Sequence, residues 1–176
     1  MKKINKYISE RLHINKDTGN RQYNYHPKSR KELKELVDQL IEKRGNDADL
    51  NDIDTSEITD MNYMFYTSKF NGDISNWAVR NVKNMHHMFY SSTFNGDISH
   101  WDVRNVEDMT YMFYGSSFNG DISNWDVSNV DSMYYMFYHS KFNGNISNWN
   151  VSNVKNMELM FNGTPLETNP PKWYKE

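Results

Sequence analysis

Cysteine is absent from this chain of 176 residues, so neither a disulfide nor a thiolate-bound metal holds the fold together. No run of apolar residues approaches the roughly 20 that a membrane-spanning helix needs. The net charge is only -3, and the chain therefore lacks the positive excess that attracts nucleic acid or an anionic membrane. We expect a fold held by packing alone, with no nucleic-acid partner and no membrane span.

The start of the sequence carries no recognisable export signal. Its first residues, MKKINKYISER, are basic, but polar residues interrupt them before the apolar segment of a signal peptide could form. This pattern predicts a cytoplasmic protein of the producing or infected cell. The alternative is a cell-surface or virion protein whose leader has been removed.

One pattern recurs at a strict period of 24 residues. The string M-x-x-M-F-Y-x-S-x-F-N-G-x-I-S-x-W-x-V-x-N-V begins at Met61, Met85, Met109 and Met133, and a shortened fifth copy begins at Met157. This period lies in the range of repeats that stack one short strand per coil. One coil cannot bury enough apolar surface to offset the entropy of ordering it, so the copies must pack against one another.

Each copy predicts a short helical segment, a turn and a strand. The residue before the leading methionine is of a type that caps helix N-termini, and the column is Asp60, Asn84, Asp108, Ser132 and Asn156. Phe-Asn-Gly follows, which indicates a tight turn because Asn and Gly tolerate positive φ. The alternation Trp-x-Val predicts a strand, and stacking would align Trp77, Trp101, Trp125 and Trp149 in an internal ladder.

These elements predict an α/β solenoid, a leucine-rich-repeat-like right-handed coil of 24-residue repeats that each contain a short parallel strand and a short helical segment. Residues 1–49 form an N-terminal segment with a capping helix, 50–164 the repeats, and 165–176 a C-terminal cap. The helix is expected over about 29–44, because Ser29 and Glu32 have capping-box spacing, apolar residues follow on one face, and Gly45 ends the pattern.

The string F-N-G-D-I-S-N-W-D-V-S-N-V-x-x-M-x-x-M-F, at Phe118 to Phe137, resembles the repeat of the BspA-like leucine-rich-repeat family, in the branch found in mycoplasma-type surface lipoproteins. The resemblance covers about residues 50–164. It implies parallel strands along one face, and binding of host proteins, other cells or matrix rather than catalysis. Similar repeats occur in phage-encoded proteins. The chain departs from the surface members because it has no evident signal peptide, lipobox or wall anchor.

Two surfaces are candidates for partner binding. The first is the concave strand face, whose residues vary between copies, and it consists of Asn76, Arg80, His100, Asp102, Arg104, Asn124, Asp126, Asn148 and Asn150. A solvated face without a partner is the alternative interpretation. The second is a lateral surface on the helical side, formed by Tyr63, His87, Tyr111 and Tyr135. A neighbouring column, Tyr66, Tyr90, Tyr114 and Tyr138, is predicted to be core.

No residue pattern points to catalysis or to a metal. The column Asp73, Asp97, Asp121 and Asn145 has oxygen ligands that suit calcium, but these side chains more simply accept N-H groups of turns. The adjacent His86 and His87 lack the spacing of a zinc site. The serines recur identically in every copy, whereas a nucleophile is needed once. We therefore predict no catalytic residue, no metal and no cofactor, and the protein is not expected to be an enzyme.

The sequence thus predicts a non-enzymatic interaction module that binds a protein, or a glycan, through the concave strand face. The missing export signal favours a phage-encoded or intracellular binder or inhibitor of a host factor. The alternatives are a bacterial surface adhesin-like repeat protein and a structural component of a virion or assembly. No motif fixes the oligomeric state, and a monomer is favoured.

Overall fold

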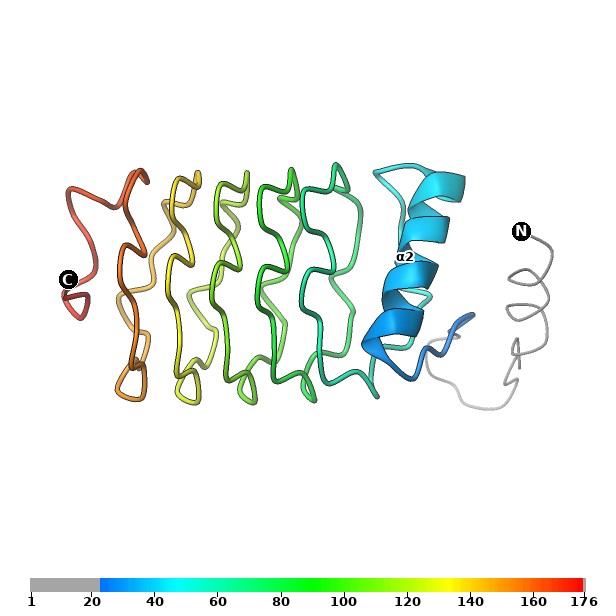
Figure 1. Ribbon diagram of the computed structural model, residues 1–176, viewed down its shortest axis with the longest axis horizontal. Helices are drawn as coiled ribbons and strands as arrows, with labels where there is room; N and C mark the ends of the chain where they lie inside the picture. The colour runs from blue at the N-terminus through cyan, green and yellow to red at the C-terminus, as the bar shows by residue number, and fades with distance from the viewer. Residues whose placement is uncertain (1–22, 176) are drawn as a thin grey trace.

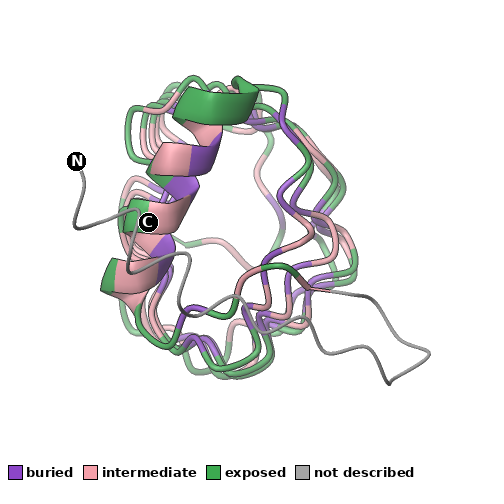
Figure 2. Cartoon of the chain, turned by 90° about the vertical axis from the view of Figure 1, so that its right-hand side faces the viewer, coloured by how far each residue is buried: buried purple, intermediate pink, exposed green. Residues whose placement is uncertain are grey.

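The computed structural model describes residues 23–175, and these form a stack of similar coils behind one helix. Figure 1 shows the coils side by side along one axis, with helix α2 lying across the N-terminal end of the stack. Seen along that axis, the coils superpose in a single closed outline (Figure 2). Within the described part of the chain, no helix is long and apolar enough to cross a membrane.

Helix α2 spans Arg30–Arg44 and confirms the helix predicted over about 29–44. The hydroxyl of Ser29 accepts from the N-H of Glu32, and the Glu32 carboxylate accepts from the N-H of Lys28. The helix ends at Gly45, which has φ 93. Its buried side chains, Leu33, Val37 and Leu40, belong to the same apolar cluster as the first coil residues. The helix therefore closes one end of the core.

The prediction of an α/β solenoid built from strand-helix units is wrong. Among the described residues, α2 is the only α-helix, and pairing between coils is limited to isolated parallel bridges rather than strands. The repeated bridges join residues of the expected helix-capping column, and they are Asp60 to Asn84, Asn84 to Asp108, Asp108 to Ser132 and Ser132 to Asn156. The Trp-x-Val segments, which were expected to be the strands, take no part in these bridges.

The physical reason lies in the methionine-rich segment of each coil. These segments are 61–68, 85–92, 109–116, 133–140 and 157–164, and we call them the Met segments. In the first, the N-H groups of Met61, Tyr63, Phe65 and Thr67 donate to carbonyls of the next coil at 2.7–3.0 Å. In an α-helix that begins at Met61, the N-H groups of Phe65 and Thr67 would instead donate within the segment, to the carbonyls four residues back. Bonding between coils replaces bonding along the chain.

Left-handed residues make this arrangement possible. Two positions in every Met segment, four residues apart, have positive φ, and they are Tyr63 and Thr67, His87 and Ser91, Tyr111 and Gly115, Tyr135 and His139, and Leu159 and Gly163. A positive φ cannot be accommodated in a right-handed helix. The chain is thereby turned so that alternate carbonyls point toward the N-terminal end of the stack and alternate N-H groups toward the C-terminal end.

The interior is a set of aromatic columns. Phe65, Phe89, Phe113, Phe137 and Phe161 are fully buried, and consecutive rings stack with centroids 5.4–6.0 Å apart. The tryptophan ladder is confirmed as buried, because Trp77, Trp101, Trp125 and Trp149 are 3–4% exposed. Each indole Nε1 donates to a carbonyl 27 residues earlier, as Trp125 does to Ile98 at 3.1 Å. Burial thus leaves no indole donor unsatisfied.

The Phe-Asn-Gly motif has a different role from the one predicted. Neither Asn71 nor Gly72 has positive φ, and the same holds in the later copies. Glycine is required because a Cβ at Gly72 would lie 2.0 Å from the Ala48 carbonyl oxygen. The asparagine side chain joins coils, since Asn71 Oδ1 accepts from the N-H of Asn95 at 2.8 Å. In the later copies a Cβ at the glycine would first meet the phenylalanine ring of the same motif at 2.7–2.9 Å, so the glycine serves close packing rather than a left-handed turn.

Candidate functional site

Eight aromatic rings form a continuous face on one side of the stack, and we call it the aromatic face. Its first column is Tyr63, His87, Tyr111 and Tyr135, and its second is Tyr66, Tyr90, Tyr114 and Tyr138. All eight belong to Met segments, so one short stretch of each coil supplies one ring to each column. The first column is the lateral surface that the sequence predicted.

The rings stack closely along the axis. Centroids in the first column are 4.7, 4.6 and 5.3 Å apart, with interplanar angles of 10–26°. Those in the second column are 4.9, 4.6 and 5.0 Å apart, with angles of 5–19°. The two columns also touch each other, with centroids 4.8–5.7 Å apart within each coil. Neighbouring rings cover each other's faces. The columns therefore present ring edges and hydroxyl groups to solvent.

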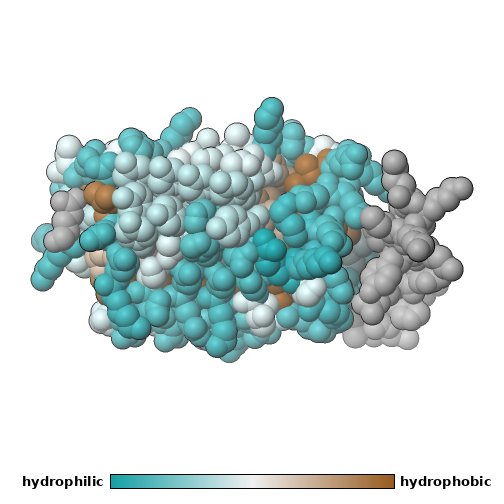
Figure 3. All heavy atoms as spheres, in the orientation of Figure 1, coloured by the Kyte–Doolittle hydropathy of each residue, from teal (hydrophilic) through white to brown (hydrophobic). Residues whose placement is uncertain are grey.

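This face is open to solvent although it is aromatic. Tyr63 is 38% exposed and Tyr66 43% exposed, and the other six rings are half-buried. The prediction that the Tyr66 column belongs to the core is therefore wrong. Figure 3 shows a broad area of intermediate hydropathy over the coils, bordered by strongly hydrophilic residues. The sequence alone could not decide this, because a column of identical tyrosines is equally consistent with a buried position.

Backbone geometry fixes the first column in place. Tyr63, His87, Tyr111 and Tyr135 have φ of 54–56°, so each side chain leaves the backbone in the same direction. Such a conformation costs about 1–2 kcal/mol for a residue other than glycine. The bonds to the next coil hold it, as in the 3.0 Å bond from the N-H of Tyr63 to the carbonyl of His86. The rings are thus arranged before any partner arrives.

The aromatic face carries no formal charge at neutral pH. Burial, and secondly the neighbouring His86, lower the pKa of His87 to about 4, so its imidazole is neutral. Burial also raises the pKa of Tyr90, and a hydrogen bond with Tyr134 raises that of Tyr135, so both phenols stay protonated. Beside the face, the Asp108 carboxylate lies 3.7 Å from His86 Nδ1. The face is suited to a partner that offers apolar surface and hydrogen-bonding groups.

The polar surface predicted as the concave strand face lacks strands. Its residues do lie in successive coils, and most are exposed, namely Arg80, His100, Arg104, Asn124, Asp126, Asn148 and Asn150. Asn76 and Asp102 are half-buried. The Asp102 carboxylate lies 2.7 Å from Arg104 Nε and 4.0 Å from Arg80 Nε. The charged groups at this end of the surface therefore contact one another, and partner binding there stays a prediction.

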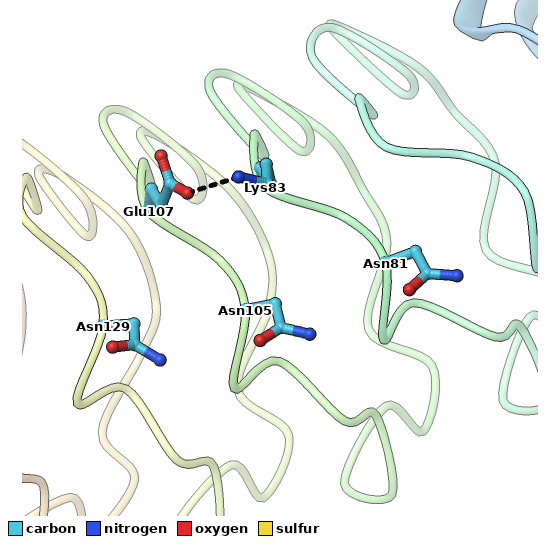
Figure 4. Close-up of a pocket in the computed structure, with 5 residues that line it drawn as sticks. All are labelled: Asn81, Lys83, Asn105, Glu107 and Asn129. Carbon is cyan, nitrogen blue, oxygen red and sulfur yellow. Dashed lines mark hydrogen bonds and ion pairs between the residues drawn. The ribbon is translucent and has the colours of Figure 1, made fainter.

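A polar hollow of about 360 Å³ lies on the outside of the coils. Figure 4 shows Asn81, Asn105 and Asn129 aligned in successive coils, with Lys83 and Glu107 paired beside them at 2.9 Å. Each amide Nδ2 donates to a carbonyl of the preceding coil at 2.7–2.8 Å. Sequence reasoning missed this ladder, although the asparagine recurs before the second valine of every copy. The amides join coils, which accounts for their recurrence without a ligand.

The aspartate column accepts hydrogen bonds from turns, as predicted. Asp73, Asp97 and Asp121 each accept the N-H of the serine two residues later at 2.9 Å, and Asn145 does so at 3.1 Å. Within residues 23–175 no group of three or more histidine, aspartate or glutamate side chains is placed to hold a metal ion.

Comparison with protein families gives one result. A family described as Mycoplasma protein of unknown function, DUF285, matches residues 31–141 and 115–174. Together the two matches span residues 31–174 of the 176, which includes all of α2 except Arg30 and every Met segment. No curated protein and no solved structure matches the chain.

Proposed function

The chain belongs to the DUF285 family of mycoplasma proteins, and we propose that it is a non-enzymatic module that binds a partner protein through the aromatic face. The observation that carries the proposal is the exposure of two preformed, mutually stacked columns of tyrosine and histidine rings. Tyrosine is enriched in protein interfaces because it supplies a large contact area at low entropy cost.

Ring geometry favours a protein over a glycan. Sugars pack against open aromatic faces, but here the facing rings of successive coils cover one another at 4.6–5.3 Å. What remains accessible is a row of ring edges and phenolic hydroxyl groups, which can donate to and accept from the main chain or side chains of a protein. We infer a partner surface that is largely apolar and carries hydrogen-bond acceptors.

The resemblance of residues 118–137 to BspA-like repeats supports a role in binding rather than in catalysis. Under this proposal the chain acts either as an intracellular or phage-encoded binder of a host factor or as an adhesin-like protein at a cell surface. A structural part of a virion or assembly is the third alternative, and it would use the aromatic face for contact between copies. These three roles require different partners, but each uses the aromatic face.

Affinity capture with paired variants tests the surface. In the first variant Tyr66, Tyr90 and Tyr114 are each replaced by serine, which removes three rings of the second column, one exposed and two half-buried. The matched control replaces Arg80 and Arg104 by serine on the polar surface. We expect the control to capture the same partner as the unaltered chain, and the tyrosine variant to lose at least about tenfold in the amount captured.

The capture experiment distinguishes the aromatic face from the polar surface as the binding site. Loss of capture in the arginine variant alone would return the site to the polar surface predicted from sequence. Retention of the partner by both variants would contradict the proposal. Circular dichroism and the melting temperature of both variants establish that lost capture reflects lost contacts rather than unfolding.

A further inference from the structure

The C-terminal end of the stack has an unused row of backbone hydrogen-bonding groups. In the first four Met segments, alternate N-H groups donate to the next coil, as Met133 does to Asn156 at 2.8 Å. The described residues that follow the last Met segment, 165–175, do not form another such segment. Among the described residues, nothing accepts from the N-H groups of Met157, Leu159 and Phe161, and nothing donates to the carbonyl of Lys155.

This edge retains the geometry used for pairing elsewhere. Leu159 has φ 53 and Gly163 φ 70, the same left-handed pair that occurs in the coils before it. The fourth donor of the row, the N-H of Gly163, is bound by the chain's own Glu167 carboxylate at 3.1 Å. A carboxylate oxygen of the chain therefore already occupies one of the positions that a carbonyl of a further coil would take.

Apolar side chains beside the row are incompletely covered. The valines and methionines at earlier registers are buried, but in the last coil Val151, Val154 and Met157 are only half-buried. The C-terminal segment covers the other side of the end, where Trp173 stacks on Trp149 at 6.3 Å and its Nε1 donates to Ile146. The chain itself thus covers Phe161, whose ring centroid lies 4.9 Å from that of Tyr174, but it leaves Val154 and Met157 half-buried.

The polarity of the row determines what fits it. Three N-H donors on one edge need a segment with alternate carbonyls on its facing edge, whereas an ordinary β-strand alternates donors and acceptors along each edge. The same end of a second copy presents donors as well, so it cannot pair. The acceptor end of a second copy lies under α2, where Arg30 Nε donates to the Asn62 carbonyl at 2.7 Å.

We propose that this edge, residues 154–161, binds a Met segment of another polypeptide that carries the same M-x-x-M-F-Y repeat. The incoming segment takes the left-handed alternation of the existing coils, offers three carbonyls to Met157, Leu159 and Phe161, and donates one N-H to Lys155. Its valine covers Val154. The edge thereby continues the coil-to-coil interface in trans, on a surface separate from the aromatic face.

A peptide with the sequence of residues 105–114, NVEDMTYMFY, is a suitable probe. Within the chain, its Asp108, Thr110 and Met112 carbonyls accept from the preceding coil, and its Glu107 N-H donates to the Lys83 carbonyl. Titrated into the isotope-labelled full chain, the capped peptide should shift the amide resonances of Met157, Leu159 and Phe161 and slow their hydrogen exchange by at least about tenfold. A scrambled peptide should do neither.

Two variants that each add one positive charge test where the peptide contacts the edge. Val154→Lys places an ammonium group on the end of the core and should weaken peptide binding by at least about tenfold, while Ser152→Lys, at an exposed position of the same coil, should change it by less than about twofold. The amide measurements on the unaltered chain stand whether or not Val154→Lys folds.

Several results would overturn the proposal. Absence of shifts at the three amides, equal binding of the scrambled peptide, or equal affinity of Val154→Lys would each show that the edge is not a site for repeat segments. A dimer in sedimentation velocity without peptide, with the same amides already protected, would identify a second copy as the occupant instead.

Discussion

Thr67 has a backbone conformation that a β-branched residue rarely adopts. Its φ is 52, and the equivalent positions in later coils are Ser91, Gly115, His139 and Gly163. The N-H of Thr67 donates to the Tyr90 carbonyl at 2.7 Å, so the bond to the next coil is kept at the cost of local strain. Glycine in two of the five copies shows which residue suits the position best.

Replacing Thr67 by glycine should therefore stabilise the protein. Relief of the left-handed strain exceeds the entropy that glycine adds to the unfolded chain, and we expect the free energy of unfolding to rise by roughly 0.5–1 kcal/mol. Urea denaturation followed by tryptophan fluorescence measures the change. Lys69→Gly is the control, because Lys69 does not have positive φ, and there the free energy should fall by about 0.5 kcal/mol. Equal effects at both positions would argue against strain at Thr67.

His87 makes the stability of the protein depend on pH. Burial and then His86 hold its pKa at about 4, below the ordinary 6.5. The unfolded chain therefore binds the proton first, and stability is complete above pH 6.5 and decreases as the pH falls toward 4. Asp52 and Asp54, whose pKa values lie below the ordinary 3.8, lose their contributions at lower pH, outside this window.

Denaturation midpoints measured between pH 7 and pH 4.5 check this dependence. His87→Tyr is the matched variant, since tyrosine occupies the same register in the neighbouring coils. Its stability should change much less over that range. A variant with the same pH dependence as the unaltered chain would show that another group is responsible.

The coil, rather than the residue, is the unit that buries the tryptophans. Trp125 is 4% exposed, its ring centroid lies 6.5 Å from that of Phe113, and its Nε1 donates to Ile98 in the preceding coil. One side chain therefore contributes to packing within its coil and to bonding between coils. Removing it should weaken both interfaces of a central coil.

Trp125→Ala is expected to lower the free energy of unfolding by roughly 3–5 kcal/mol and to reduce the cooperativity of the transition. Chemical denaturation followed by circular dichroism measures both. Asn124→Ala, a neighbouring exposed position, should change stability by less than about 0.5 kcal/mol. An unchanged midpoint for Trp125→Ala would contradict the buried ladder.

Sequence periodicity predicted most of the buried core but not the conformation of the coil. The 24-residue repeat placed Trp77 and its equivalents inside, and Ser29 and Gly45 marked the ends of α2, because burial and capping depend on residue type. The spacing of Met61, Met64 and Phe65 indicated a helix, yet bonds to the next coil prevail over this weak local preference. Gly115 and Gly163 were the available signal for left-handed positions.

The candidate site was only partly predictable. Tyr63 and its column were expected at the surface, and they line the aromatic face. Tyr66 was expected in the core and is 43% exposed, because identical residues at one register show only that neighbours stack, not which side faces solvent. The direction of the side chains depends on the left-handed backbone, which local propensity does not encode.

The whole stack has a direction. Alternate peptide groups of the Met segments are aligned from coil to coil in the sense opposite to that of an α-helix, with carbonyls toward the N-terminal end and N-H groups toward the C-terminal end. The chain places a cation at one end, where Arg30 binds the Asn62 carbonyl, and an anion at the other, where Glu167 binds the Gly163 N-H. This polarity closes the N-terminal end under α2 and leaves donors at the C-terminal end.

Scalar coupling across hydrogen bonds tests the coil-to-coil arrangement most directly. In a deuterated, isotope-labelled sample, a long-range HNCO spectrum should connect the Phe113 amide nitrogen with the carbonyl carbon of Met136, to which it donates at 2.8 Å. A helical Met segment would instead connect Phe113 with Met109, four residues earlier. Detection of the Met136 coupling would support the stack as described, and detection of the Met109 coupling in its place would contradict it.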